Sequence, residues 1–180
     1  MKVCFTNFSD LNEPTTINAF HLAEEMAARG HEVTMFLPKI GRKYITRSKK
    51  ARMKYFGIIP SPRELRIISH ATIQTFQVLR HEFDVVQAFK PLIQSALPAA
   101  VAGTLKRGIR ILYWDDYETF GQRLDPKSNP LYTSLIGHLE KAFLKMFDGA
   151  LCVSPFLANI AKSTLASERV LLIPTGFDRA

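Results

Sequence analysis

Glycine is absent from the first 29 residues of this sequence, and the whole chain of 180 residues holds only nine. P-loop and dinucleotide-binding turns need glycines directly after the first strand, because backbone N–H groups must close on the phosphates. Gly103 and Gly108 have the spacing of a P-loop, but Ile109-Arg110 follow them where Lys and Ser or Thr are needed. The sequence therefore argues against a phosphate-binding turn built on the opening strand.

Cysteine and long apolar runs are also scarce. Cys4 and Cys152 are the only two cysteines, and both lie in segments expected to be buried strands, which favours reduced core thiols over a disulfide. No apolar run approaches the roughly 18 to 20 residues that cross a bilayer. The chain opens on a strand-like segment, without the apolar stretch and cleavage site of a secretory signal. We expect a cytoplasmic protein.

Acidic residues are missing from residues 39–54, a segment with eight of the 24 lysines and arginines. The rest of the chain carries 16 residues of each sign, so the net charge of +8 comes from this segment alone. Three interpretations stay open: a solvated loop, a patch that binds an anionic membrane surface, or a nucleic-acid contact. No recognised nucleic-acid module accompanies the charge, so nucleic acid is the least expected partner. The candidate membrane- or anion-binding residues are Arg42, Lys43, Tyr44, Arg47, Lys49, Lys50, Arg52, Lys54, Tyr55 and Phe56.

The signatures of a metal site and of a nucleophilic hydrolase are lacking as well. No pair among the five histidines has metal-ligand spacing with a cysteine or carboxylate, so we expect no metal. The Gly-x-Ser-x-Gly motif does not occur, and Ser154 is followed by Pro155, which favours the start of a helix over a nucleophile.

What the sequence does have is a regular alternation of apolar strand-like runs with helical periodicity. This pattern predicts a single α/β domain over residues 1–180, with a Rossmann-like doubly wound parallel sheet and helices on both faces. A basic loop at residues 39–60 interrupts the alternation. One helix is expected to bury Leu65, Ile68, Ile73, Phe76 and Leu79. The expected strands are 2–8, 31–38, 83–89, 109–114, 149–154 and 170–174, and the expected helices are 16–30, 61–80, 91–108, 129–147 and 155–166.

Polar side chains follow several of these strands, at the sheet edge where ligands of α/β proteins bind. Asp115 is the candidate catalytic residue, because a carboxylate there can act as a general base or orient a substrate hydroxyl. The alternative is that Asp115 or Asp116 only caps the following turn. The candidate substrate-binding residues are Asp10, Asn12, Glu13, Thr15, Thr16, Lys90, Asp116, Glu118, Ser154, Thr175 and Gly176.

The order of these parts resembles the N-terminal, acceptor-side domain of GT-B glycosyltransferases, most closely the retaining group 1 or family 4 enzymes. The resemblance spans nearly the whole chain, and the basic segment is its least determined part. The stretches that carry it are MKVCFTNF (1–8), LAEEMAARGHEVTMF (22–36), FDVVQAFKP (83–91), GIRILYWDDYE (108–118), FDGALCVSPFLANIA (147–161) and VLLIPTGFD (170–178).

The resemblance implies that this chain is the acceptor-binding half of an enzyme that transfers a sugar from a nucleotide diphosphate sugar to a glycan or lipid-linked acceptor. The donor-binding domain would follow the Ile-Pro-x-Gly-x-Asp segment, in the same or a separate chain, and the 180 residues alone would be inactive. No cofactor is expected in this chain. The resemblance also favours peripheral docking of residues 39–56 at the inner face of the membrane.

The sequence departs from the family at three places. The family's Gly-Gly turn after the first strand is replaced by SDLNEPTTIN (9–18), its His before Asp115 is replaced by Trp114, and its His-Ala-His stretch by Gln87 to Phe89. These departures leave open an unusual acceptor. They also leave open a non-catalytic module, derived from such a domain, that binds a glycan, a lipid or a protein.

Overall fold

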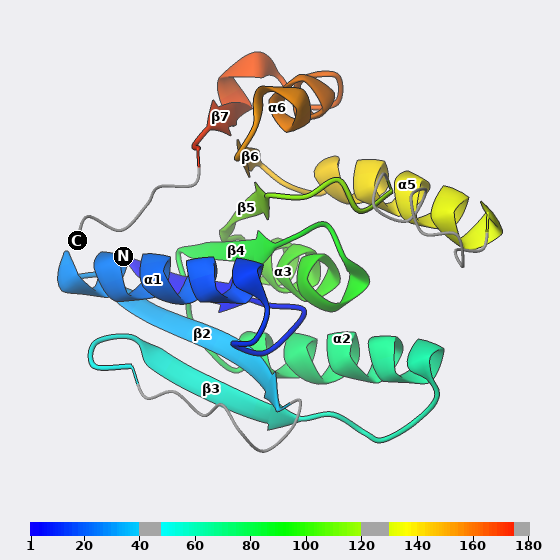
Figure 1. Cartoon of the computed structure of the whole chain (residues 1–180). Helices are drawn as coiled ribbons and strands as arrows, with labels where there is room; N and C mark the ends of the chain where they lie inside the picture. The colour runs from blue at the N-terminus through cyan, green and yellow to red at the C-terminus, as the bar shows by residue number, and fades with distance from the viewer. Residues whose placement is uncertain (40–47, 120–129, 175–180) are drawn as a thin grey trace.

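In the computed structural model, which describes residues 1–39, 48–119 and 130–174, strands and helices alternate along the chain (Figure 1). Within these residues seven strands form one sheet in the order β3-β2-β1-β4-β5-β6-β7, and neighbouring strands pair in parallel throughout. The elements are β1 (Lys2–Thr6), α1 (Pro14–Ala28), β2 (Glu32–Lys39), β3 (Arg52–Gly57), α2 (Arg63–Leu79), β4 (Val85–Phe89), α3 (Ile93–Lys106), β5 (Ile109–Trp114), α5 (Pro130–Leu144), β6 (Gly149–Cys152), α6 (Pro155–Lys162), a 3-10 turn (Ser167–Arg169) and β7 (Val170–Leu172).

The sheet has a core on each face, which confirms the doubly wound parallel architecture predicted from the sequence. On one face α1 packs through Ala19 and Ala23 against β1 and β2. The opposite core is shared by α2, α3, α5 and α6. The strand order reverses between β1 and β4, so the carboxyl ends of these two strands form the switch point where ligands of such folds bind.

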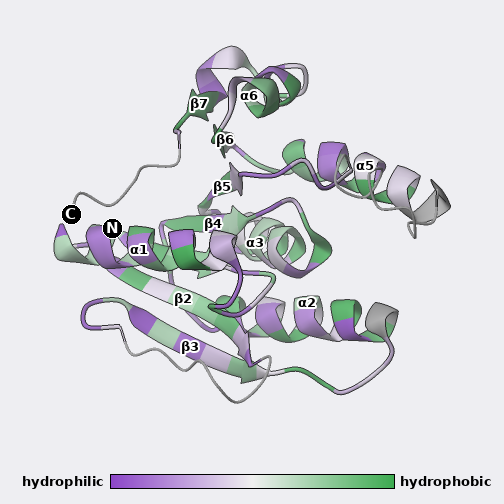
Figure 2. Ribbon diagram, in the orientation of Figure 1, coloured by the Kyte–Doolittle hydropathy of each residue, from purple (hydrophilic) through white to green (hydrophobic). Residues whose placement is uncertain are grey.

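The buried face of α2 differs from the prediction. Leu65, Ile68 and Phe76 are 58–62% exposed, so the expectation that they form the core face of this helix was wrong. Ile73 and Leu79 do pack against the core, as predicted, and beside them the helix buries His70, Ala71, Gln74 and Val78. Its buried polar side chains donate to backbone oxygens of other segments. Gln74 Nε2 donates to Asn7 O at 3.2 Å and to Gln94 O at 2.7 Å. Figure 2 shows hydrophobic and hydrophilic segments alternating along this helix.

The predicted basic loop at residues 39–60 is also corrected, because Arg52–Gly57 forms the edge strand β3. It pairs in parallel with β2, from Thr34 opposite Arg52 to Lys39 opposite Gly57. Phe56 is 4% exposed, and its ring lies 5.2 Å from that of His70. The assignment of Phe56 to a membrane-binding surface was therefore wrong, because this side chain belongs to the core.

The remaining candidates of the basic segment divide into three groups. Lys49, Lys50, Arg52 and Lys54 are exposed, whereas Tyr55 is half-buried against the core beside α1. Arg42, Lys43, Tyr44 and Arg47 lie outside the described residues. No helix in the described part of the chain is long and apolar enough to cross a membrane.

Candidate functional site

Lys90 directly follows β4, in a left-handed backbone conformation that residues other than glycine rarely adopt, with φ at 69°. Two hydrogen bonds hold it there: its N–H donates to Tyr113 O at 2.9 Å, and its carbonyl accepts from Ser95 Oγ at 2.8 Å. This turn directs the lysine side chain back across the switch point, where it is 5% exposed.

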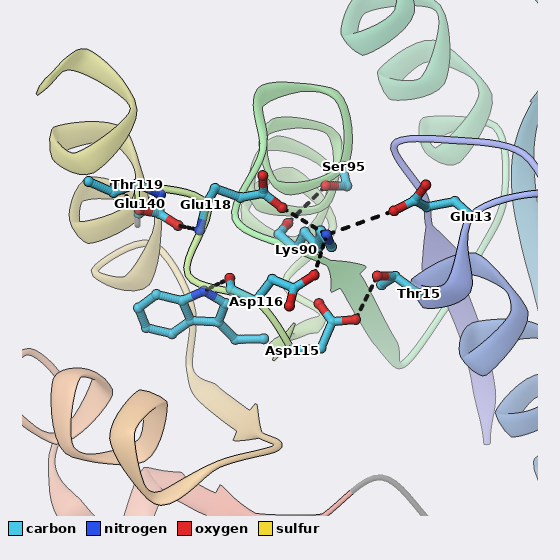
Figure 3. A network of polar contacts seen from close by, with 10 residues as sticks. Glu13, Thr15, Lys90, Ser95, Asp115, Asp116, Glu118, Thr119 and Glu140 are labelled. Carbon is cyan, nitrogen blue, oxygen red and sulfur yellow. Dashed lines mark hydrogen bonds and ion pairs between the residues drawn. The ribbon is translucent and has the colours of Figure 1, made fainter. Parts of the chain in front are cut away.

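A cluster of carboxylates surrounds the Lys90 ammonium group (Figure 3). Its Nζ donates to Asp116 Oδ2 at 2.8 Å and to Glu118 Oε1 at 2.7 Å, and Glu13 Oε1 lies 4.0 Å away. Burial alone would lower the pKa of Lys90, but these hydrogen bonds and the nearby acidic charges raise it above its ordinary value. Lys90 is therefore a permanent cation that organises the loops after β1, β4 and β5.

Asp115, the candidate catalytic residue, points into the same cluster from the end of β5. Its Oδ2 accepts a hydrogen bond from Thr15 Oγ1 at 2.6 Å, while its Oδ1 is buried and has no hydrogen-bond partner among the described residues. Burial raises the pKa of Asp115, although the Thr15 hydroxyl and the Lys90 charge oppose the increase. The result is a carboxylate of increased basicity with one free oxygen, which suits it to accept a proton or a hydrogen bond.

A further acidic residue, on α5, holds the segment that follows β5. Glu140 on α5 is fully buried and accepts hydrogen bonds from the backbone N–H of Glu118 at 2.9 Å, from the N–H of Thr119 at 3.3 Å and from the Thr119 hydroxyl. Burial raises the pKa of Glu140, and these hydrogen bonds oppose the increase. The sequence analysis did not single out Glu140. The sequence feature that could have identified it is an acidic residue within a helix of mostly apolar residues, α5.

The other predicted residues after β1 make local contacts. Asp10 is buried, and its Oδ1 accepts from the N–H of Asn12 at 3.0 Å and from Asn12 Nδ2 at 2.9 Å, which closes an Asx turn. Thr16 is also buried, and its hydroxyl donates to Ser9 O at 3.4 Å. Of this loop, Thr15 and Glu13 reach the Lys90–Asp115 cluster.

Candidates near the end of the chain do not join the cluster. The Ser154 hydroxyl accepts from the N–H of Leu157 at 3.3 Å, which caps α6 in the way that the following proline indicates. Thr175 and Gly176 lie outside the described residues. Among the described residues, no group of three or more His, Cys, Asp or Glu side chains is arranged to hold a metal ion.

A pocket of about 570 Å³ opens beside the cluster and shares Glu118 with it. The sequence analysis missed this pocket, because its walls come from segments far apart in the chain. It lies between the segment that follows β3, helix α2, the turn before α3, and helix α5. Ile58, Ile67, Leu92, Ile93 and Leu139 contribute to its apolar walls, and Lys39 and Arg66 also line it.

Several solved structures share this fold at low sequence identity. Sucrose-phosphate synthase from Thermosynechococcus elongatus gives a TM-score of 0.69 at 16% identity, over 99% of this chain and 49% of that one. UDP-GlcNAc 2-epimerase from Neisseria meningitidis, bound to UDP-GlcNAc, gives 0.64 at 11% identity, over 96% of this chain and 46% of that one. UGT89C1 from Arabidopsis thaliana, complexed with UDP, gives 0.62 at 12% identity, over 99% and 49%. The chain thus spans about half the length of these proteins.

No curated protein matches the sequence. The profile of Glycosyltransferase Family 4, however, matches residues 17–180, which is most of the chain. The similar structures show that the fold is a Rossmann-like domain of the GT-B type, as the resemblance in sequence predicted. This chain belongs to Glycosyltransferase Family 4.

Proposed function

We propose that residues 1–180 form the acceptor-binding domain of a retaining glycosyltransferase that uses a nucleotide diphosphate sugar. The observation that carries this proposal is the free, buried oxygen of Asp115 at the carboxyl end of β5, next to the cation of Lys90. An acceptor hydroxyl that reaches this oxygen at the switch point can donate to a basic carboxylate that receives no hydrogen bond there from the described residues. Asp115 orients this hydroxyl and accepts its proton as the hydroxyl oxygen bonds to the anomeric carbon. The bond from that carbon to the diphosphate breaks on the same face, which retains the configuration.

Donor binding falls to a second domain in this proposal. The described residues after β1 provide carboxylates and threonines instead of a glycine turn, and Lys90 is already neutralised by Asp116 and Glu118. A diphosphate needs cations or backbone N–H groups that are free to receive it. Several GT-B-type neighbours are about twice as long as this chain, and two of them hold UDP or UDP-GlcNAc. These lengths support a donor domain beyond the 180 residues.

The test is sugar transfer by this domain joined to its donor domain, compared with the 180 residues alone. We expect no turnover by the 180 residues, because Lys90, the cation of the cluster as far as the structure describes it, is already paired and cannot stabilise the departing diphosphate. In the complete enzyme, Asp115→Asn should lower kcat by about 10²-fold or more while the fold is kept. Glu168→Gln, an exposed position far along the chain, serves as the matched control and should leave kcat unchanged. Full activity of Asp115→Asn would refute the role of Asp115, and acceptor binding without transfer would identify a non-catalytic module.

We also propose that the exposed lysines around β3 attach the domain to an anionic membrane surface. Lys49, Lys50 and Lys54 are exposed on the edge strand and the turn before it, where acidic headgroups can reach them. Each basic residue near such a surface contributes about 1 kcal/mol. Reversing two of these charges should therefore weaken vesicle binding roughly thirtyfold or more.

Flotation with phosphatidylserine vesicles measures this effect. Lys49→Glu/Lys50→Glu should lose binding, while Lys141→Glu/Lys145→Glu, with the same change in net charge at two other exposed positions, should keep it. Equal losses in both double variants would show that net charge, and not the surface around β3, governs the association. Preferential and steeply salt-dependent binding of the unaltered protein to duplex DNA would contradict membrane docking.

A further inference from the structure

The pocket beside the Lys90 cluster combines an apolar interior with two basic side chains at its edge. Its volume of about 570 Å³ lies within the range of small-molecule sites. Ile58 from the segment after β3, Ile67 from α2, Ile93 from α3 and Leu139 from α5 converge on it. An apolar pocket of this size lined by side chains from four segments fits a hydrocarbon chain or ring better than it fits a bare sugar.

The charged residues that line the pocket are not equivalent. Glu118 is the acidic one, and its carboxylate is already bound to Lys90 Nζ at 2.7 Å. Lys39 and Arg66 are exposed, and neither takes part in any ion pair among the described residues. His70, the remaining titratable side chain in the lining, is neutral at pH 7, because burial lowers its pKa to about 4. The pocket therefore presents, next to an apolar cavity, two cations without an acidic partner in the described part of the chain.

We propose that this pocket binds a single anionic amphiphile, with its hydrocarbon part among Ile67, Ile93 and Leu139 and its anionic group at Lys39 and Arg66. The geometry favours one inserted molecule over adsorption to a bilayer, because the apolar side chains line a cavity and not a flat face. Glu118 belongs both to the lining of the pocket and to the Lys90 cluster, so a bound amphiphile lies beside that cluster. The further step, that this amphiphile is the sugar acceptor, rests on the proposed function. The binding site itself does not.

The test uses monomeric alkyl phosphates, at concentrations below micelle formation, and the 180-residue protein in a calorimetric titration. Each methylene added to the chain, from hexyl to decyl phosphate, should strengthen binding by about threefold to fourfold until the pocket is filled. Inorganic phosphate and an alcohol of the same chain length should each bind at least about tenfold more weakly than the alkyl phosphate, because each satisfies only one half of the site.

Two variants locate the site. Arg66→Glu should weaken decyl phosphate binding by about tenfold or more, because a charge-assisted contact is replaced by repulsion. Ile67→Trp should fill the cavity and remove the dependence on chain length. Lys141→Glu is the control for Arg66→Glu, and Leu105→Trp is the control for Ile67→Trp. Both lie at exposed positions outside the lining and should bind like the unaltered protein. Unchanged circular dichroism and melting temperature show that each variant is folded.

Affinity that does not depend on chain length, or that is equal for an alkyl trimethylammonium of the same length, would overturn the proposal. So would equal losses in the variants and their controls. These outcomes are independent of catalysis. Amphiphile binding without transfer to the amphiphile in the complete enzyme would refute its role as acceptor and leave the binding site standing. Transfer to a soluble glycan with no amphiphile binding would refute the binding site and leave the proposed function standing.

Discussion

Lys90 and Arg107 are the two described residues other than glycine with a positive φ, and their roles differ. Arg107 is the C-cap of α3, a position that commonly takes the left-handed conformation. Lys90 ends a strand, where nothing in the regular structure demands that conformation. A left-handed conformation away from a cap persists only where the surroundings impose it, and such residues concentrate at functional sites. The left-handed turn at Lys90 directs its side chain to the carboxylates of Asp116 and Glu118.

Substituting Lys90 should separate the backbone strain from the ion pairs. Lys90→Ala should lower the free energy of unfolding by about 2 kcal/mol, less than a fully buried pair because Asp116 is largely solvated. Lys90→Gly loses the same ion pairs but relieves the backbone, so it should be about 1 kcal/mol more stable than Lys90→Ala. Urea unfolding measures both.

The neighbouring helix offers the control for this comparison. At Lys106, inside α3, glycine should be less stable than alanine by about 1 kcal/mol, which is the ordinary order in a helix. If alanine were the better residue at position 90 as well, the left-handed turn would carry no strain. If Lys90→Ala unfolded like the unaltered protein, the carboxylate cluster would not depend on its cation.

At the scale of elements, Glu24 ties α1 to the start of β3. Its Oε1 accepts from the Ser48 hydroxyl and from the N–H of Ala51 at 3.2 Å. Burial is the largest single effect and opposes ionisation, but these hydrogen bonds, together with those from the backbone of Lys49 and Lys50, outweigh it and lower the pKa of Glu24 below its ordinary value. One side chain thus organises the turn that leads from the basic segment into the edge strand.

Removing this contact should loosen β3 selectively. In Glu24→Ala, amide hydrogen exchange of Ala51 and of the β3 residues should become at least about tenfold faster at pH 7, because an edge strand has pairing on one side only. Glu25→Ala is the matched control, since Glu25 pairs with Arg29 on the surface of α1 and makes no hydrogen bond or ion pair with β3 among the described residues. Equal effects of both variants would mean that Glu24 acts through the helix and not through β3.

The same contact predicts a pH dependence of stability. A lowered folded pKa means that the contribution of Glu24 is complete above its ordinary pKa of 4.5 and is lost as the pH falls through the lower folded value. The difference in melting temperature between the unaltered protein and Glu24→Ala should therefore shrink below about pH 4.5. A difference that stays constant down to full protonation would show that the carboxylate charge plays no part.

The elements show which features the sequence could and could not predict. The apolar strand segments and the polar residues that follow them can be recognised from neighbouring residues alone. The positions of Lys90 and Asp115 at the edge of the sheet were therefore predicted from the pattern. The core face of α2 was not visible, because what it buries depends on the oxygens of Asn7 and Gln94, far away in sequence. Strand β3 was hidden by its basic residues, which an edge strand tolerates because one side faces water.

At the scale of the whole molecule, the two faces of the sheet are covered unequally (Figure 1). Within the described residues, α1 is the only helix whose residues join the core on its side, through β1 and β2. On the same side, further along the sheet, Ile109 is 54% exposed and Leu171 is 57% exposed. The parallel register aligns Leu171 with Leu151 and Tyr113, which makes a row of apolar side chains across β5, β6 and β7. A row of this kind is a surface that tends to associate.

The isolated 180-residue chain should therefore self-associate through this row. At about 0.15 M salt, where the Debye length of about 8 Å screens the net positive charge, its sedimentation coefficient should rise with concentration. Ile109→Lys/Leu171→Lys should sediment as a monomer over the same range, because one charge falls in the row and the other on the same exposed face of β5. Leu65→Lys/Leu105→Lys gains the same charge at exposed helix positions and should associate like the unaltered chain. If both double variants became monomeric, net charge would be the cause. A monomeric unaltered chain at every concentration would show that this face of the sheet needs no cover.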